Sequence, residues 1–80
     1  MTKANDQFNL RYIKLGLKIA YYRKLDCLTQ EQLAERIGIS PRYLSLIESS
    51  TFAQPVSLKT LFAAADVFKI PPHKLLDFDE

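Results

Sequence analysis

The chain has 80 residues, a formal net charge of +2 and 48% hydrophobic residues. This length gives room for one domain with a modest core, but not for an elaborate active site. The lone cysteine, Cys27, cannot form an internal disulfide, and neither a basic-then-apolar leader nor a long apolar run marks export or membrane insertion. We therefore expect a single domain over residues 1–80 that works in the reducing cytoplasm without a membrane.

The chain should begin with a polar arm and a long helix. Residues 1–7 lack periodicity, which predicts a flexible arm, with Asn5 or Asp6 as a cap for the helix that follows. From Phe8 to Leu25, apolar residues recur at helical spacing in two sets. The set expected to face the core is Phe8, Tyr12, Leu15, Ile19 and Tyr22. The second set, on roughly the opposite side, is Leu10, Ile13, Leu17, Ala20 and Tyr21.

One domain of this size can hardly cover both faces of that helix. The second set is therefore a candidate surface for another chain or for the folded-back arm. The alternative is that these are ordinary exposed apolar residues, and the sequence leaves both open.

No group of residues carries the pattern of a metal or catalytic site. Cys27 is expected to be a small buried or half-buried filler, and His73 a solvated side chain. The two lie 46 positions apart and satisfy no zinc template. An acid–base pair, a nucleophile beside a base and a Gly-rich phosphate loop are also missing from the sequence. We expect no metal, no cofactor and no enzymatic activity.

The stretch from Thr29 to Glu48, TQEQLAERIGISPRYLSLIE, predicts two short helices joined by a tight turn. Thr29 and Gln32 have the spacing of a capping box, and Gly38 supplies a residue that tolerates positive φ at the turn. Ser40 can cap the second helix, with Pro41 at its first position. Leu44 and Ile47 are expected to face inward. The residues expected to face outward are Arg42, Tyr43, Ser45, Leu46 and Glu48.

A loop and two further helices should complete the chain. Residues 49–55 contain turn formers without helix or strand periodicity. Ser57 can cap a fourth helix with one apolar side formed by Leu58, Leu61, Phe62, Ala65 and Phe68. The Pro71-Pro72 pair opens a last short helix over residues 73–78. Five helices with short connections predict an all-α domain.

The motifs TQEQLAERIGIS and YLSLIE resemble the helix-turn-helix of the lambda-repressor and Cro-like family, also called the xenobiotic-response-element (XRE) family. This resemblance implies a compact five-helix, lambda-repressor-like domain that places its second hairpin helix in the major groove of double-stranded DNA. It also implies that Gln30 contacts the DNA backbone, and that Arg23 both faces phosphate and pairs with Glu48.

The expected DNA contacts fall into two groups. The candidate base-reading residues are Ser40, Arg42, Tyr43, Ser45 and Leu46. The candidate phosphate contacts are Arg23, Thr29, Gln30, Ser49 and Ser50. Family members often carry a glycine and basic residues just after the glutamate, whereas here Ser49 and Ser50 begin an uncharged loop. The basic side of the chain favours a polyanion, because residues 1–60 carry nine Lys or Arg against five acids and residues 61–80 carry two against four.

The sequence therefore favours a small transcriptional regulator, a repressor that binds a palindromic operator as a homodimer. The alternative is a protein-interaction or antitoxin-like module of the same fold with weak or no DNA binding. The possible surface for a second copy of the chain or for another partner would include Leu10, Ile13, Leu17 and Tyr21.

Overall fold

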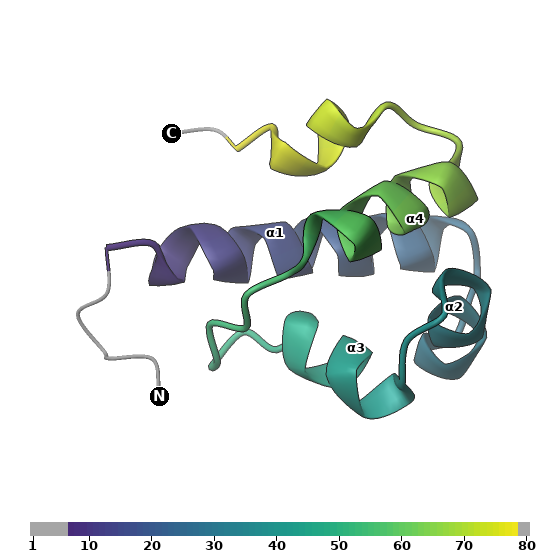
Figure 1. Ribbon diagram of the computed structural model, residues 1–80, viewed down its shortest axis with the longest axis horizontal. Helices are drawn as coiled ribbons and strands as arrows, with labels where there is room; N and C mark the ends of the chain where they lie inside the picture. Colours follow the sequence, from purple (N-terminus) through teal and green to yellow (C-terminus); the bar gives the residue numbers. More distant parts are fainter. Residues whose placement is uncertain (1–6, 79–80) are drawn as a thin grey trace.

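The computed structural model describes residues 7–78, which form four α-helices and one 3₁₀ helix (Figure 1). The elements are α1 (Asn9–Leu25), α2 (Gln30–Ile37), α3 (Pro41–Ile47), α4 (Leu58–Phe68) and η1 (Pro72–Leu76). No strand occurs in this range, which confirms the all-α class. Apart from Gln7, the expected arm and its cap residues Asn5 and Asp6 lie outside the described residues.

The expected fifth α-helix is wrong in type. Residues 72–76 form a 3₁₀ helix, and the Lys74 N–H donates to the carbonyl of Pro71, three residues back, at 3.0 Å. The segment is only five residues long, and short helical segments commonly use this tighter hydrogen-bond pattern.

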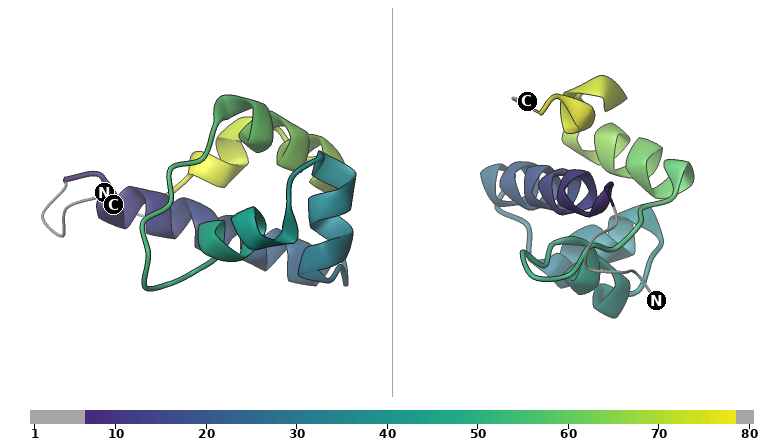
Figure 2. Two further views of the ribbon diagram at one scale, coloured as in Figure 1. Left: turned by 60° about the horizontal axis from the view of Figure 1, so that its bottom comes forward. Right: turned by 90° about the vertical axis from the view of Figure 1, so that its left-hand side faces the viewer.

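Helix α1 runs through the middle of the molecule. In Figure 1, α3 lies on one side of α1, α4 and η1 lie on the other, and α2 crosses near one end. The end-on view of α1 in Figure 2 shows the same order, with α2 and α3 below and the C-terminal segment above. One side of α1 therefore packs against the α2–α3 hairpin, and the other packs against α4 and η1.

Three α-helices begin with the caps expected from sequence. Thr29 Oγ1 accepts from the Gln32 N–H at 3.0 Å, and Gln32 Oε1 accepts from the Thr29 N–H at 2.9 Å, which completes the capping box. Ser40 caps α3 and Ser57 caps α4 in the same way, each accepting from the N–H three residues on. These hydrogen bonds satisfy donors that the helix itself leaves unpaired.

Three helices also end alike, in Schellman motifs. The left-handed residues are Cys27 after α1, Gly38 after α2 and Lys69 after α4, with φ of 58°, 79° and 59°. In each motif the next residue donates back five positions, as from the Leu28 N–H to the Arg23 carbonyl at 3.1 Å. The stop at Gly38 was expected. The filler role of Cys27 is wrong, because its side chain is exposed at this turn.

Aliphatic side chains from every helix form the core. The largest fully buried side chains are Ile19, Leu33, Leu44, Ile47 and Leu75. The expected inward side of α4 is partly wrong, because Leu58 and Phe62 are 66% and 50% exposed. The face that packs inward is Leu61, Ala64, Ala65 and Phe68, whose helical spacing turns the other two side chains away.

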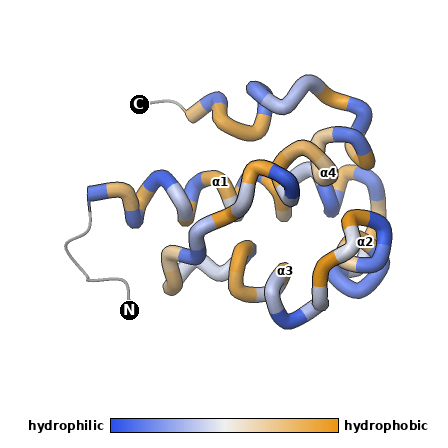
Figure 3. The backbone as a smooth tube through the Cα atoms, in the orientation of Figure 1, coloured by the Kyte–Doolittle hydropathy of each residue, from blue (hydrophilic) through white to orange (hydrophobic). Residues whose placement is uncertain are grey.

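The two apolar sets on α1 separate as the periodicity predicts, with two exceptions. Leu15 and Ile19 are buried, but Phe8 of the same set is exposed. In the second set Ala20 is buried, whereas Leu10, Leu17 and Tyr21 are 59%, 46% and 57% exposed, and Ile13 is half-buried. Figure 3 shows apolar positions recurring along α1 between polar ones. An apolar face of α1 thus stays open among the described residues.

Candidate nucleic-acid interface

Helix α3 is seven residues long and is fixed at its start by a local signal. Ser40 Oγ accepts from the Tyr43 N–H at 3.0 Å, and Pro41 occupies the first helical position. Leu44 and Ile47 anchor its inner side in the core. The outer side and the N-terminal end of α3 are therefore held rigidly at the surface.

Two candidate base-reading side chains are free to meet a ligand. Arg42 and Ser45 are exposed, and within residues 7–78 neither side chain makes a hydrogen bond. The Ser40 hydroxyl is exposed but already accepts the capping bond. Arg42 is accordingly the one long, multi-donor side chain near the start of α3.

Tyr43 and Leu46 do not face outward as fully as expected. Tyr43 is half-buried, packs against the core, and donates from its hydroxyl to the Pro55 carbonyl at 3.3 Å. Leu46 is also half-buried. Tyr43 thus ties the loop before α4 to α3, which leaves it less available to a base edge than Arg42.

Glu48, at the C-terminal end of α3, is held by Arg23 of α1. Arg23 Nε donates to Glu48 Oε1 and Oε2 at 3.1 and 2.9 Å, and Nη2 donates to Oε1 at 3.0 Å. Nη1 donates to the Leu28 carbonyl at 2.7 Å. The two side chains are only 12% and 5% exposed. The ion pair implied by the family resemblance is present, and it consumes most donors of Arg23.

Gln30 joins the same cluster from the first position of α2. Its Nε2 donates to Glu48 Oε1 at 2.9 Å, which fixes the plane of the amide and leaves a second N–H on Nε2. Thr29 is exposed beside it, with its hydroxyl accepting the capping bond. Because the N-terminus of a helix favours anions, Gln30 is placed where a phosphate could accept its remaining N–H.

The loop after α3 is ordered by its own hydroxyl groups. Ser49 Oγ accepts from the backbone N–H groups of Thr51 and Phe52 at 3.1 and 3.3 Å. Ser49 is half-buried, whereas Ser50 is exposed. Of these two candidate phosphate contacts, Ser50 is the more accessible and Ser49 shapes the loop.

Gly16 is a positioning residue that sequence reasoning missed. It is buried in the middle of α1, and a Cβ at this position would overlap the carbonyl oxygen of Ile47 and lie 2.8 Å from its carbonyl carbon. The signal was available, since the chain has only two glycines and one inside a helical pattern often marks a close backbone approach.

The matches to known proteins agree with this arrangement. Residues 19–75 match the Helix-turn-helix family, a span that starts in α1 and ends in η1. The chain belongs to this helix-turn-helix family, in its XRE branch.

Several known proteins align with most of the chain. An uncharacterized HTH-type transcriptional regulator of Methanocaldococcus jannaschii is 33% identical over 63 residues, which cover 79% of this chain and 92% of the relative. The restriction-modification controller protein C.AhdI of Aeromonas hydrophila has a TM-score of 0.72 at 28% identity, covering 80% of this chain and 94% of that one. The N-terminal DNA binding domain of SinR from Bacillus subtilis has a TM-score of 0.72 at 33% identity, covering 82% and 94%.

The helix-turn-helix family gives the chain its general function. The relatives include an HTH-type transcriptional regulator and SinR, a master regulator for biofilm formation that has been solved in complex with DNA. Proteins of this family are not enzymes. The present chain is therefore a DNA-binding transcriptional regulator of the helix-turn-helix family.

The described residues contain neither a metal-ligand cluster nor a membrane-spanning helix. Among residues 7–78, no group of three or more His, Cys, Asp or Glu side chains could hold a metal ion. None of the helices in that range has the length and apolar character needed to cross a membrane.

Proposed function

We propose that this HTH protein binds double-stranded DNA sequence-specifically as a homodimer on a palindromic operator and represses transcription in the cytoplasm. One observation carries the proposal: exposed Arg42 stands at the start of a helix whose inner face is buried and whose far end is fixed by Glu48. An exposed side chain with several donors, carried by a helix whose inner face is anchored in the core, suits readout in the major groove.

Base reading rests mainly on Arg42, because a guanidinium can donate to both O6 and N7 of guanine. Ser45 and Ser40 can add shorter contacts, and Leu46 can pack its exposed part on a thymine methyl group. Tyr43 contributes mainly by holding the loop before α4 through its hydrogen bond to Pro55. A direct contact between Tyr43 and a base is secondary.

Phosphate contacts position the protein without selecting a sequence. Gln30, Thr29 and Ser50 lie at the α2 N-terminus or in the loop after α3, where short polar groups and backbone N–H groups can meet the DNA backbone. Ser49 supports that loop. Arg23 acts mainly through Glu48, which it orients together with Gln30.

A homodimer follows from the small size of the reading element. A single seven-residue helix reads too few bases for useful discrimination, and two-fold dimers place their reading helices about 34 Å apart on successive major grooves. The exposed side chains of Leu58 and Phe62 lie four residues apart on α4 and therefore on one helix face. We assign the seam between the two copies to this face.

Repression needs no further chemistry. A dimer that occupies its operator can exclude polymerase sterically, and the similarity to a restriction-modification controller protein supports a regulatory role. A reporter placed behind the selected operator should lose expression when the protein is present.

The decisive experiment is binding of the full chain to mixed-sequence and selected DNA over a series of salt concentrations. The logarithm of the affinity should fall linearly with the logarithm of salt concentration, with a slope of about −0.9 per neutralised phosphate. Lys74→Ala, a change of an exposed lysine in η1 away from α3, is the control and should keep the wild-type slope. A flat response would contradict DNA binding through phosphate contacts.

The seam has its own test, because sedimentation of the free protein reports its oligomeric state and titration of a palindromic site reports cooperativity. Leu58→Ser with Phe62→Ser should make the free protein monomeric and remove cooperativity between the two half-sites. Leu76→Ser, which alters a side chain that is 49% exposed on η1, should leave the dimer intact. If the two variants have the same oligomeric state and cooperativity, the seam does not lie on this face of α4.

A second candidate function is a protein-interaction or antitoxin-like module with weak DNA binding. The observation that favours it is the open apolar face of α1 together with an uncharged loop after α3. Binding of a protein partner is compatible with DNA binding, because the two would use different sides of α1.

A further inference from the structure

The proposed reading helix and the proposed seam lie on different helices that pack chiefly on α1 and α2 rather than on each other. Arg42 belongs to α3, whereas Leu58 and Phe62 belong to α4. The loop of residues 48–57 connects the two helices (Figure 1). The orientation of the reading helix relative to the seam therefore depends on this loop as well as on the core.

One side chain of α3 reaches the loop. The Tyr43 ring is half-buried and packs against the core, and its hydroxyl donates to the Pro55 carbonyl at 3.3 Å. Because packing already holds the ring, little side-chain freedom is lost when the hydrogen bond forms. Tyr43 follows Arg42 directly, and its N–H is bound by the cap residue Ser40. The hydroxyl thus joins the N-terminal turn of α3 to the loop.

The segment from Pro55 to Leu58 is constrained at each step. The ring of Pro55 fixes its φ angle, and Val56 packs against the core. Ser57 Oγ accepts from the Thr60 N–H at 3.1 Å and donates to the Thr60 hydroxyl at 3.0 Å. Leu58 is the next residue and the first of α4. A shift of the Pro55 carbonyl should therefore move the start of α4 as well.

The separation of two reading helices is sensitive to small rotations of α3 against α4. In a two-fold dimer, reading helices about 34 Å apart each lie roughly 17 Å from the axis. A rotation of roughly 5° in both copies then changes the separation by about 3 Å, close to the rise of about 3.4 Å for one base pair. One hydrogen bond in each copy can thus influence which half-site spacing the dimer prefers.

We propose that Tyr43 is a positioning residue that sets the half-site spacing of the regulator. Its hydroxyl, through Pro55, fixes the orientation of α3 relative to the face of α4 that carries Leu58 and Phe62. This inference rests on the proposed homodimer and its seam. A dimer without the hydrogen bond still reads each half-site through Arg42, but it accepts a wider range of spacings.

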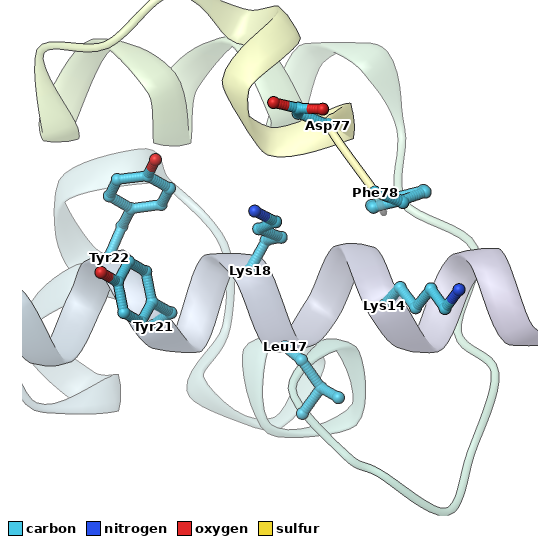
Figure 4. A pocket seen from close by; sticks show the side chains of 7 residues that line it. All are labelled: Lys14, Leu17, Lys18, Tyr21, Tyr22, Asp77 and Phe78. Atoms are coloured by element: carbon cyan, nitrogen blue, oxygen red, sulfur yellow. The ribbon is translucent and has the colours of Figure 1, made fainter. Parts of the chain in front are cut away.

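Two other side chains provide matched controls. Gln54 Nε2 donates to the same Pro55 carbonyl at 3.3 Å, but this bond joins neighbouring residues and makes no link to α3. Tyr21 is an exposed tyrosine of α1 that lines a hollow beside the C-terminal segment (Figure 4). Within residues 7–78 its hydroxyl makes no hydrogen bond. Tyr21→Phe therefore removes the same chemical group from a different helix.

The test uses the full chain and palindromic DNA in which the number of base pairs between the selected half-sites varies. Tyr43→Phe keeps the ring and removes only the hydroxyl. It should reduce the preference for the best spacing over its neighbours about threefold to tenfold, the range expected for the loss of one hydrogen bond. Gln54→Ala and Tyr21→Phe should keep the wild-type preference. A general loss of stability would lower the affinity for every spacing alike.

Three results would overturn the proposal. One is an unchanged spacing preference in Tyr43→Phe while Leu58→Ser with Phe62→Ser still removes cooperativity, in which case the proposed dimer stands without this role of Tyr43. Another is an equal loss on a single half-site and on the palindrome, which would make the hydroxyl a direct DNA contact. The last is a dimer that the two serine substitutions leave intact, because the seam itself would then lie elsewhere.

Discussion

Gly16 of α1 lies directly against the carbonyl group of Ile47, the last residue of α3. No other residue type fits here without a shift, because a Cβ would overlap the Ile47 oxygen. Seven residues later on α1, Arg23 holds Glu48, the neighbour of Ile47. Helix α1 therefore fixes the C-terminal end of α3 through one backbone contact and one ion pair.

The first prediction concerns Gly16→Ala. Helix propensity alone would make the variant more stable by about 1 kcal/mol, whereas overpacking against Ile47 should cost roughly 1–3 kcal/mol. We expect the second effect to dominate, because the contact is with backbone that cannot rotate away. Urea unfolding measures the net change, with Lys24→Ala as the control on an exposed site of the same helix. A more stable Gly16→Ala protein would show that α3 moves at little cost.

The second prediction concerns the ion pair. Arg23→Ala should lower the free energy of unfolding by roughly 3 kcal/mol, because Glu48 would stay buried without its main partner. Glu48→Ala should also destabilise the protein, since Arg23 would lose three hydrogen bonds. The double variant should lose less than the sum, because no buried charge remains unpaired. Additive losses in this double-mutant cycle would mean that the two residues act separately.

Gln30→Ala should separate positioning from reading. The variant keeps the Arg23–Glu48 pair, so the fold should stay intact, and the lost Gln30–Glu48 hydrogen bond should lower the unfolding free energy by about 1 kcal/mol. Affinity should fall by about 0.5–1.5 kcal/mol on every DNA sequence alike, the usual value of one hydrogen bond. Gln32→Ala is the control, because it should lower stability through the lost capping box and have little effect on DNA binding. A change in the preferred sequence with Gln30→Ala would make Gln30 a base reader.

Arg42→Ala should act on specificity. We expect a loss of about 1–3 kcal/mol on the preferred site, a much smaller loss on random DNA, and a flattened preference at one base pair per half-site. Selection of binding sites from a random pool measures this. Arg36→Ala is the matched control, because Arg36 is exposed on α2 and was not assigned to base reading. If the variant selects the wild-type sequence with equal stringency, readout passes to Ser45, Leu46 or DNA shape.

The left-handed helix ends give a prediction about stability alone. Lys69 has a φ of 59° and no glycine-like freedom, and a side chain in this region costs roughly 1–2 kcal/mol. Lys69→Gly should therefore raise the thermal midpoint, with the higher chain entropy of glycine in the unfolded state offsetting part of the gain. Gly38→Ala, at the equivalent turn after α2, should lower it. A fall with Lys69→Gly would mean that the lysine side chain contributes more than its backbone strain costs.

Local interactions are the part of this structure that the sequence determined by itself. The capping box of Thr29 and Gln32, the Ser40–Pro41 start of α3 and the glycine stop at Gly38 all involve residues within a few positions of each other. Their hydrogen bonds close within one turn of chain, so spacing suffices to predict them. The inward face of α3, formed by Leu44 and Ile47, followed from helical periodicity for the same reason.

Contacts between distant segments were decided only by the tertiary structure. The exposure of Leu58 and Phe62 depends on which face of α4 meets the core. The Tyr43 hydroxyl donates to the Pro55 carbonyl because the fold brings these two residues together. Cys27 is exposed because a non-glycine residue takes the left-handed turn that ends α1. The approach of Gly16 to Ile47 depends on how α1 crosses α3. Such outcomes are set by packing between helices, which the spacing of residues along one helix does not specify.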